Sequence, residues 1–172
     1  HGSRKEVRTA RIVVGADGRR SRIADLVGAG LVAVAANTSA FIYGYWEELE
    51  VSGYEWAYGD RAAAGFIPTN DSRTCVFVGA DSRRIGRDGP GVVAALTAAA
   101  SPSMSARLRE VAAPARLRTF PGQAGYLRSA WGPGWALVGD AGSWKDPISA
   151  HGLTDALRDA ELLARALVVH LR

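Results

Sequence analysis

The spacing of hydrophobic residues changes along the chain and divides it into three parts. In the first part, residues 11–15 form a short β-branched run that is closed by Asp17-Gly18, which predicts a strand ending in a tight turn. Ser21 is a suitable N-cap for a brief helix over residues 22–27. The first part is therefore predicted to contain a strand, a turn and a short helix.

The second part, from about residue 31 to residue 78, has a period of two. Phe41, Tyr43 and Tyr45 point to one face of a strand over residues 39–46, and the residues between them point to the other face. This alternation predicts an antiparallel sheet. Its further strands are expected over residues 54–58, 63–67 and 74–78, followed by helices over 90–100 and 102–111 and an extended segment over 116–120.

The third part follows a loop-rich stretch over residues 121–134 and ends in a long helix. Residues 135–138 form an apolar strand, Gly139-Asp140 follow it, and a loop leads into the helix. One helix face carries apolar residues at spacings of three and four: Leu153, Leu157, Ala160, Ala164, Leu167 and Leu171. Because such units flank the antiparallel sheet on both sides, we expect a mixed α/β (α+β) fold in which one domain interrupts another.

Composition limits the classes of protein to which the chain can belong. Of its 172 residues, 48% are hydrophobic and 22% are charged, as in ordinary globular proteins. No apolar run approaches the ~20 residues of a membrane span. The first residues are polar, unlike a signal peptide, and His1-Gly2-Ser3 resembles the remnant of an expression tag. The single cysteine, Cys75, is predicted to be a buried structural thiol, so we expect a cytoplasmic protein.

The formal net charge of +4 comes largely from arginine and lysine residues near the start of the chain. No aromatic residues interleave with them, and no helix-turn-helix or zinc-finger pattern follows. We therefore expect no nucleic-acid partner. These residues are interpreted as a solvated face or as a face that meets an anionic cofactor.

A carboxylate and a helix start mark the candidate ligand site. Gly139-Asp140-Ala141 follows a buried strand, and open α/β sheets bind ligands at the carboxyl ends of their strands. The long helix begins near Gly152, which lets a ligand approach closely, and the free N–H groups there favour an anion. The residues alone predict a ligand with hydroxyl groups near Asp140 and negative charge near Gly152. The alternative, that Asp140 only caps a turn, stays open.

These motifs resemble those of a known family, the flavoprotein monooxygenases with the para-hydroxybenzoate hydroxylase fold. Residues 14–21, Val-Gly-Ala-Asp-Gly-Arg-Arg-Ser, are similar to the family's DG motif. The family's GD motif resembles residues 139–159, with matching residues at Gly139, Asp140, Ala141, Pro147 and Gly152. The two motifs stand in the family's order, and a sheet separates them as in the family.

The resemblance implies an FAD site and NAD(P)H as the electron donor. Asp140, next to Gly139, would bind the ribityl chain, and Pro147 would shape the loop beside the isoalloxazine ring. The backbone of three residues would face the C2 carbonyl edge of the flavin: Gly152, Leu153 and Thr154. From the DG turn, Asp17 would support the cofactor region and Arg19 would meet a pyrophosphate.

In the family, the FAD-binding domain opens with a strand, a G-x-G-x-x-G loop and a helix. No such pattern precedes residue 11 in this sequence. We therefore expect a truncated chain whose FAD site is incomplete. The purified chain should be colourless, and a missing N-terminal segment should complete the site. Residues 28–33 fit the pattern G-x-G-x-x-A, but they follow a predicted short helix and precede strands. They are therefore not assigned as a dinucleotide loop.

The resemblance implies a flavin-dependent monooxygenase that uses FAD, NAD(P)H and oxygen to hydroxylate or epoxidise a small organic substrate. It implies a partial FAD-binding domain over residues 4–28 and 129–172 and a substrate domain over residues 31–128. Three alternatives stay open: a prenyl-chain reductase, a flavin halogenase, and a non-catalytic fragment that only binds a partner. No side chain is assigned as a catalytic acid or base.

Aromatic, histidine and serine side chains are further candidates for a ligand or catalytic role. Phe41, Tyr43 and Tyr45 either line a substrate pocket or belong to the core of the sheet. His151 and His170 lack cysteine or carboxylate partners at metal-ligand spacing, so no metal site is expected. The serines near the GD motif lack a nucleophile-elbow pattern, which argues against a serine hydrolase.

Overall fold

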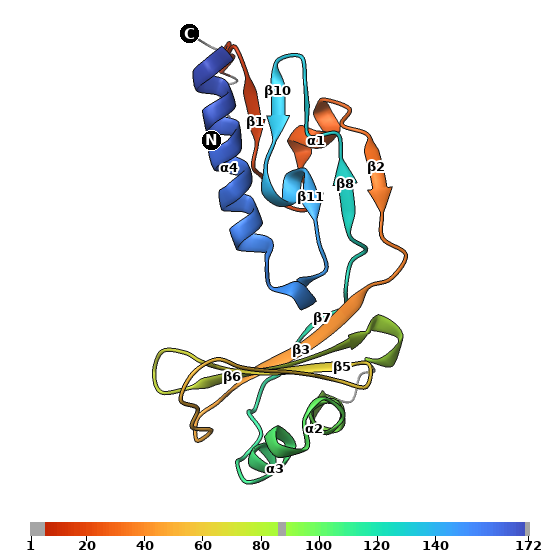
Figure 1. Ribbon diagram of the computed structural model, residues 1–172, viewed down its shortest axis with the longest axis vertical. Coiled ribbons are helices and arrows are strands. Elements are labelled where there is room, and N and C mark those ends of the chain that lie inside the picture. Colours follow the sequence, from red (N-terminus) through yellow and green to blue (C-terminus); the bar gives the residue numbers. More distant parts are fainter. Residues whose placement is uncertain (1–5, 86–88, 171–172) are drawn as a thin grey trace. The chain divides into compact units, whose positions relative to one another are not determined.

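The computed structural model describes residues 6–85 and 89–170 (Figure 1). The chain forms two compact units. Unit 1 combines the described residues up to Ala35 with those from Gly125 onward, and unit 2 consists of Ala36–Ala124. Both units mix helices with sheets, as the mixed α/β prediction requires.

The parallel strand pair of unit 1 joins the two ends of the chain. β1 (Val13–Gly15) runs parallel to β10 (Trp135–Leu137), and β9 (Trp131–Gly132) pairs with the other edge of β10. Val14 lies opposite Ala136, and the backbone N–H of Val138 donates to the Gly15 carbonyl at 2.9 Å. The two predicted strands, far apart in sequence, thus share one layer of structure.

A short helix follows β1. In α1 (Arg22–Leu26), the Ser21 hydroxyl accepts a hydrogen bond from the Ala24 N–H, as an N-cap does. Gly28 has a φ of +66°, and the next N–H, of Ala29, donates back to the Ala24 carbonyl. Gly28 therefore ends a helix, because only glycine adopts this backbone conformation without strain.

A second small sheet of unit 1 contains strands that the sequence did not predict. β8 (Tyr126–Arg128) pairs antiparallel with β2 (Leu31–Val34) on one side and with β11 (Ser143–Trp144) on the other. β8 and β9 lie in the stretch that was expected to be loop. β2 also belongs here, so the large sheet of unit 2 begins at the next strand.

The long helix α4 (Gly152–His170) starts where the glycine predicted it. It meets the end of β10 at Gly139, whose N–H donates to the Asp159 carboxylate at 3.3 Å. A Cβ at Gly139 would lie 3.0 Å from Ala156 Cβ, and its φ is +57°, so both packing and backbone require glycine. Leu153 and Leu157 of the predicted apolar face are exposed, while Leu171 lies outside the described residues.

Unit 2 is built on a five-stranded antiparallel sheet. Its order is β4 (Glu55–Gly59), β5 (Ala62–Pro68), β6 (Thr74–Asp81), β3 (Ser39–Trp46) and β7 (Arg118–Phe120). A 3-10 turn over Ser82–Arg84 follows β6. Two helices, α2 (Gly89–Ala100) and α3 (Pro102–Arg109), cover one side of the sheet (Figure 1).

The two faces of this sheet carry different side chains because alternate residues of a strand point to opposite faces. The face toward the helices forms the apolar core, which includes Ile42, Trp46, Phe66, Val76 and Val78. Strand register assigns six aromatic residues to the other face: Phe41, Tyr43, Tyr45, Trp56, Tyr58 and Phe77. We call this surface the aromatic face.

Two glycines make room for the rings of the aromatic face. A Cβ at Gly65 would lie 2.0 Å from Phe77 Cε1, and a Cβ at Gly79 would lie 2.4 Å from Phe41 Cε1. The rings therefore lie across the neighbouring strands. Phe77 in turn contacts Trp56, with ring centroids 4.6 Å apart.

Substitution of Gly65 by alanine tests this packing. The added methyl group must displace the Phe77 ring, so we expect Gly65→Ala to lower the free energy of unfolding by about 1–3 kcal/mol in urea denaturation. Gly53→Ala is the control, because a Cβ at Gly53 meets no atom within 4 Å. Equal stability of the two variants would contradict the packing of Phe77 over Gly65.

Candidate functional site

The candidate site of unit 1 lies at the carboxyl ends of two parallel strands. Because β1 and β10 run in the same direction, the turns that follow them emerge at one edge of the sheet. Asp17 belongs to the first turn and Asp140 to the second. In open α/β sheets this edge is the usual position of ligands.

Asp17 is occupied by its own turn. One carboxylate oxygen accepts from the Ser21 hydroxyl at 2.5 Å, and the other accepts from the backbone N–H groups of Arg22 and Ile23 at 2.8 and 3.2 Å. The Ser21 hydrogen bond, followed by the backbone N–H groups, lowers the pKa of the Asp17 carboxyl. Asp17 therefore fixes the geometry of the turn.

Asp140 differs from Asp17 because its carboxylate accepts no hydrogen bond from any described residue. It lies half-buried in a 3-10 turn over Gly139–Ala141. Desolvation raises the pKa of the Asp140 carboxyl, and the positive charge of Arg19 acts in the opposite direction. A half-buried carboxylate without a donor is suited to accept hydrogen bonds from a ligand.

Tyr126 joins the two turns. Its hydroxyl lies 2.6 Å from the carbonyl oxygen of Asp140 and 3.0 Å from that of Arg19, and it can donate to either. Burial raises the pKa of the Tyr126 phenol, so the group stays a donor. Arg19 itself stacks over Trp144, with its guanidinium carbon 4.8 Å from the ring centroid. The role of Tyr126 could not be predicted from the sequence, because Tyr126 falls in the stretch that was expected to be loop.

The loop before α4 shapes the other side of the candidate site. Pro147 begins a 3-10 turn that ends at Ser149, and the Asp146 carboxylate caps it by accepting from the Ile148 N–H at 3.0 Å. Ala150 then adopts a left-handed conformation with a φ of +54°. The chain thereby reverses direction directly before Gly152.

The first turn of α4 presents open backbone donors. Gly152, Leu153 and Thr154 are exposed residues. Within the described residues, no acceptor binds their backbone N–H groups. The Ser149 hydroxyl does not cap them, because it donates to the Asp146 carbonyl at 3.3 Å. A Cβ at Gly152 would meet no atom within 4 Å, so there is space for a group to approach.

Charged side chains near this helix start neutralise one another. Asp155 pairs with Lys145 at 2.5 Å and with Arg158 at 2.9 Å. The hydrogen bond from Lys145 is the main reason why the pKa of the Asp155 carboxyl is lowered. Since the Asp155 charge is compensated, the positive end of the helix dipole stays available to an anion.

The predicted aromatic residues belong to unit 2 and lie on the aromatic face, away from the helix-covered core. Phe41 is buried, Tyr43 is half-buried and Tyr45 is 42% exposed. They are therefore not part of the core that α2 and α3 cover. Cys75 is half-buried in β6, and burial raises the pKa of its thiol, so it carries little thiolate.

Two features are absent from the described part of the chain. There, no group of three or more His, Cys, Asp or Glu side chains could hold a metal ion. Nor does any helix in those residues combine the length and apolarity needed to cross a bilayer.

Comparison with known proteins agrees with the geometry of unit 1. A family model described as FAD binding domain matches residues 1–172. The chain belongs to this FAD-binding family. It is thus part of the flavin-dependent monooxygenase and halogenase superfamily, as the DG and GD motifs predicted.

Individual relatives give the range of the family. The ubiquinone hydroxylase UbiL of Rhodospirillum rubrum is 27% identical over 180 residues, which cover 95% of this chain and 38% of the hydroxylase. The crystal structure of PqsL, a probable FAD-dependent monooxygenase from Pseudomonas aeruginosa, is 24% identical, with a TM-score of 0.70, and covers 94% of this chain and 47% of PqsL. The myxobacterial chondrochloren halogenase CndH is 25% identical, with a TM-score of 0.71, and the match covers 92% of this chain and 39% of CndH. The chain spans less than half of each relative.

The residues of unit 1 fit parts of the FAD molecule. The half-buried Asp140 carboxylate can accept from hydroxyl groups, which the ribityl chain carries. The open N–H groups at the start of α4 can donate to an electronegative edge, and no atom lies within 4 Å of a Cβ placed at Gly152, so a ligand group can approach them. Both features match the flavin half of the cofactor.

The Asp17 turn makes a testable contribution to stability. Because the pKa of Asp17 is lowered in the folded state, its contribution is present above the ordinary value of 3.8 and is lost as the pH falls through the folded pKa. Asp17→Asn should therefore lower the melting temperature at pH 7, and its difference from the wild type should shrink below about pH 3.8. Asp25→Asn, an exposed change on α1, is the control. An Asp17 effect that is independent of pH would contradict this role.

Proposed function

We propose that this chain holds the flavin part of FAD in a monooxygenase that hydroxylates or epoxidises a small organic substrate. The observation that carries the proposal is the pairing of an open carboxylate, Asp140, with the open helix start at Gly152 in unit 1. The similarity to a ubiquinone hydroxylase supports the type of reaction. NAD(P)H is the proposed electron donor.

The proposed contacts follow the polarity of the cofactor. Asp140 accepts from a ribityl hydroxyl, and Gly139 allows the tight turn that presents it. The N–H groups of Gly152, Leu153 and Thr154 donate to the C2 carbonyl edge of the ring, beside the loop that Pro147 shapes. When bound, the flavin supplies the redox chemistry, and the protein supplies position and electrostatics.

The DG turn has a supporting role in the same proposal. Asp17 holds the turn through its hydrogen bonds, so it acts without touching the cofactor. Arg19, stacked on Trp144, presents positive charge that suits the pyrophosphate. Tyr126 keeps the Arg19 and Asp140 turns together.

The substrate is proposed to bind on the aromatic face of unit 2, where Phe41, Tyr43 and Tyr45 offer apolar contact area. Unit 1 is thereby proposed as the FAD-binding part and unit 2, Ala36–Ala124, as the substrate part, so that residues 31–35 and 125–128 of the predicted substrate domain (31–128) are assigned to the FAD-binding part that was predicted over 4–28 and 129–172.

A halogenase is the second candidate, because several similar structures are halogenases, including CndH. Measurement of product formation with oxygen, with and without halide, separates the two reactions. A prenyl-chain reductase would turn over without oxygen, and a non-catalytic protein would turn over in neither case.

Removal of the Asp140 carboxylate tests the flavin contact. In the FAD-loaded protein, Asp140→Ala should weaken FAD binding roughly ten- to hundredfold, since it removes a charge-assisted hydrogen bond of about 1.5–3 kcal/mol. Fluorescence titration of FAD measures the change. Asp25→Ala, which removes an exposed carboxylate of unit 1, should have little effect. Unchanged affinity in Asp140→Ala would reduce Asp140 to a turn residue.

Closing the space at the helix start tests the second contact. In the FAD-loaded protein, Gly152→Val should weaken flavin binding or shift its reduction potential downward, because the side chain keeps the ring from the N–H donors. Gly30→Val is the matched control, since a Cβ at Gly30 also meets no atom within 4 Å. If Gly152→Val binds and reduces FAD like the wild type, the helix start is structural only.

A further inference from the structure

The long helix α4 touches both parts of the candidate flavin site in unit 1. Its first residues, Gly152–Thr154, present the open N–H groups. Asp159 lies seven residues after Gly152, which is close to two full turns of an α-helix. Gly152 and Asp159 therefore lie on the same side of α4, roughly 10 Å apart along its axis.

The Asp159 carboxylate reaches the turn that presents Asp140. Its Oδ2 atom accepts a hydrogen bond from the Gly139 backbone N–H at 3.3 Å. Gly139 is the first residue of the 3-10 turn Gly139–Ala141, and the first N–H groups of such a turn have no partner within it. The N-cap residue, Val138, makes no side-chain hydrogen bond. Asp159 thus supplies the cap of this turn from a different element.

The turn at Gly139 depends on contacts from outside, because glycine can adopt many backbone conformations. One such contact is steric. A Cβ at Gly139 would lie 3.0 Å from Ala156 Cβ, so α4 packs directly against the turn. Ala156 lies three residues before Asp159 and shares its side of the helix. The packing at Ala156 and the hydrogen bond from Gly139 to Asp159 together fix the turn on α4.

The Asp159 side chain is itself held in place. Its Oδ1 atom accepts from the Arg158 guanidinium at 3.1 Å, and the side chain is only 27% exposed. Arg158 also pairs with Asp155 at 2.9 Å, and Asp155 pairs with Lys145 of the preceding loop. Surface ion pairs of this kind contribute little to stability. Their effect here is to orient the Asp159 carboxylate so that Oδ2 faces Gly139.

We propose that Asp159 is a positioning residue, which holds the Asp140 carboxylate in a fixed place relative to the start of α4. A flavin that contacts both Asp140 and Gly152 needs these groups at one separation, and the rigid helix between Gly152 and Asp159 sets it. The inference rests on the proposed function, because it takes Asp140 and the α4 start as flavin contacts. Asp159 acts through Gly139 and does not itself touch the cofactor.

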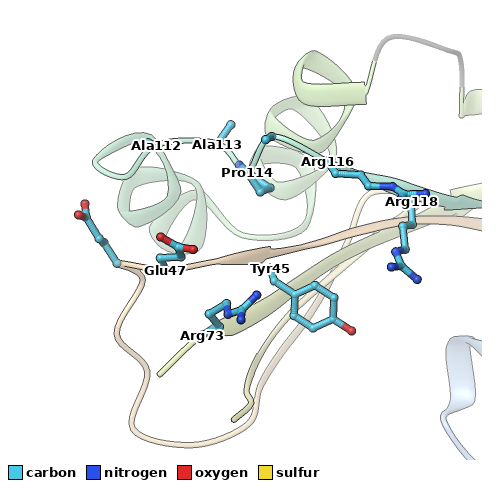
Figure 2. A pocket seen from close by; sticks show the side chains of 10 residues that line it. Tyr45, Glu47, Arg73, Ala112, Ala113, Pro114, Arg116 and Arg118 are labelled. Atoms are coloured by element: carbon cyan, nitrogen blue, oxygen red, sulfur yellow. The ribbon is translucent and has the colours of Figure 1, made fainter. Parts of the chain in front are cut away.

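Two substitutions of Asp159 separate its hydrogen bond from its charge. Asp159→Asn keeps an oxygen acceptor for the Gly139 N–H but removes the negative charge, whereas Asp159→Ala removes both. We expect the Gly139 amide to exchange with solvent about tenfold faster in Asp159→Ala and to change much less in Asp159→Asn. NMR-detected hydrogen exchange measures both rates without flavin. The amides of Tyr45 and Arg118, which line a pocket of about 470 Å³ in unit 2, are the internal reference and should exchange at the same rate in every variant (Figure 2).

The Asp140 carboxyl reports its own position. Burial raises its pKa in the wild type, and the positive charge of Arg19 opposes this in every variant. When Asp159→Ala releases the turn, the Asp140 carboxylate gains water, so its pKa should fall toward the ordinary value of 3.8. Loss of a neighbouring negative charge lowers this pKa in both variants. The additional fall in Asp159→Ala over Asp159→Asn, followed by carbon-detected NMR, therefore measures the positioning.

A double-mutant cycle with FMN links this role to the flavin site. Asp159→Ala should weaken FMN binding about tenfold while Asp140 is present, and it should change binding little in the Asp140→Ala background, because the effect passes through Asp140. Glu161→Ala is the matched control, since it removes an exposed carboxylate from the same helix. It should change neither FMN binding nor Gly139 exchange.

Three results would each overturn the proposal: an unchanged Gly139 exchange rate in Asp159→Ala, no additional fall of the Asp140 pKa in that variant, or an equal loss of FMN affinity with and without Asp140. A wild-type chain that binds no FMN contradicts the proposed function instead. The two measurements without flavin then still decide the role of Asp159. A thermal melt of each variant verifies that the fold is retained.

Discussion

The parallel pairing of β1 with β10 is the constraint on which the rest of unit 1 depends. It brings the Asp17 turn and the Asp140 turn to one edge of a sheet although about 120 residues separate them. Unit 2 accounts for most of that separation. Its first strand, β3, pairs with its last strand, β7, so the chain enters and leaves unit 2 at neighbouring positions. An insertion of this kind does not pull β1 and β10 apart, and the entropic cost of a long connection grows only slowly with its length.

Within the candidate site, residues divide according to whether their hydrogen bonds are satisfied. Asp17 and Tyr126 bind backbone and side-chain groups of the chain itself, and they hold the two turns in place. Asp140 and the first N–H groups of α4 have no such partners among the described residues. Asp140 is partly shielded from water, so a ligand hydroxyl that donates to it offsets part of its desolvation, whereas the exposed N–H groups exchange bound water for an acceptor of the ligand. The satisfied groups therefore give the site its shape, and the open groups define the ligand.

The sequence predicted the elements whose periodicity is long or whose turns carry strong signals. The alternation in β3 and the start of α4 at Gly152 are examples, and the DG and GD motifs identified the family. β8 and β9 were missed because strands of three and two residues are too short to establish a period. With β8 the role of Tyr126 was missed as well.

The most direct test of the account asks where a flavin binds on this chain. FMN carries the ring and the ribityl chain, so it needs only the contacts assigned to Asp140 and the α4 start. In an NMR titration with FMN, the account predicts that the amides of Asp140 and Gly152–Thr154 shift most, and that Asp140→Ala raises the FMN concentration needed for half of the shift at Gly152–Thr154 roughly ten- to hundredfold. Shifts that centre on other residues, or that persist unchanged in Asp140→Ala, would contradict it. The absence of any shift at saturating FMN would contradict it equally.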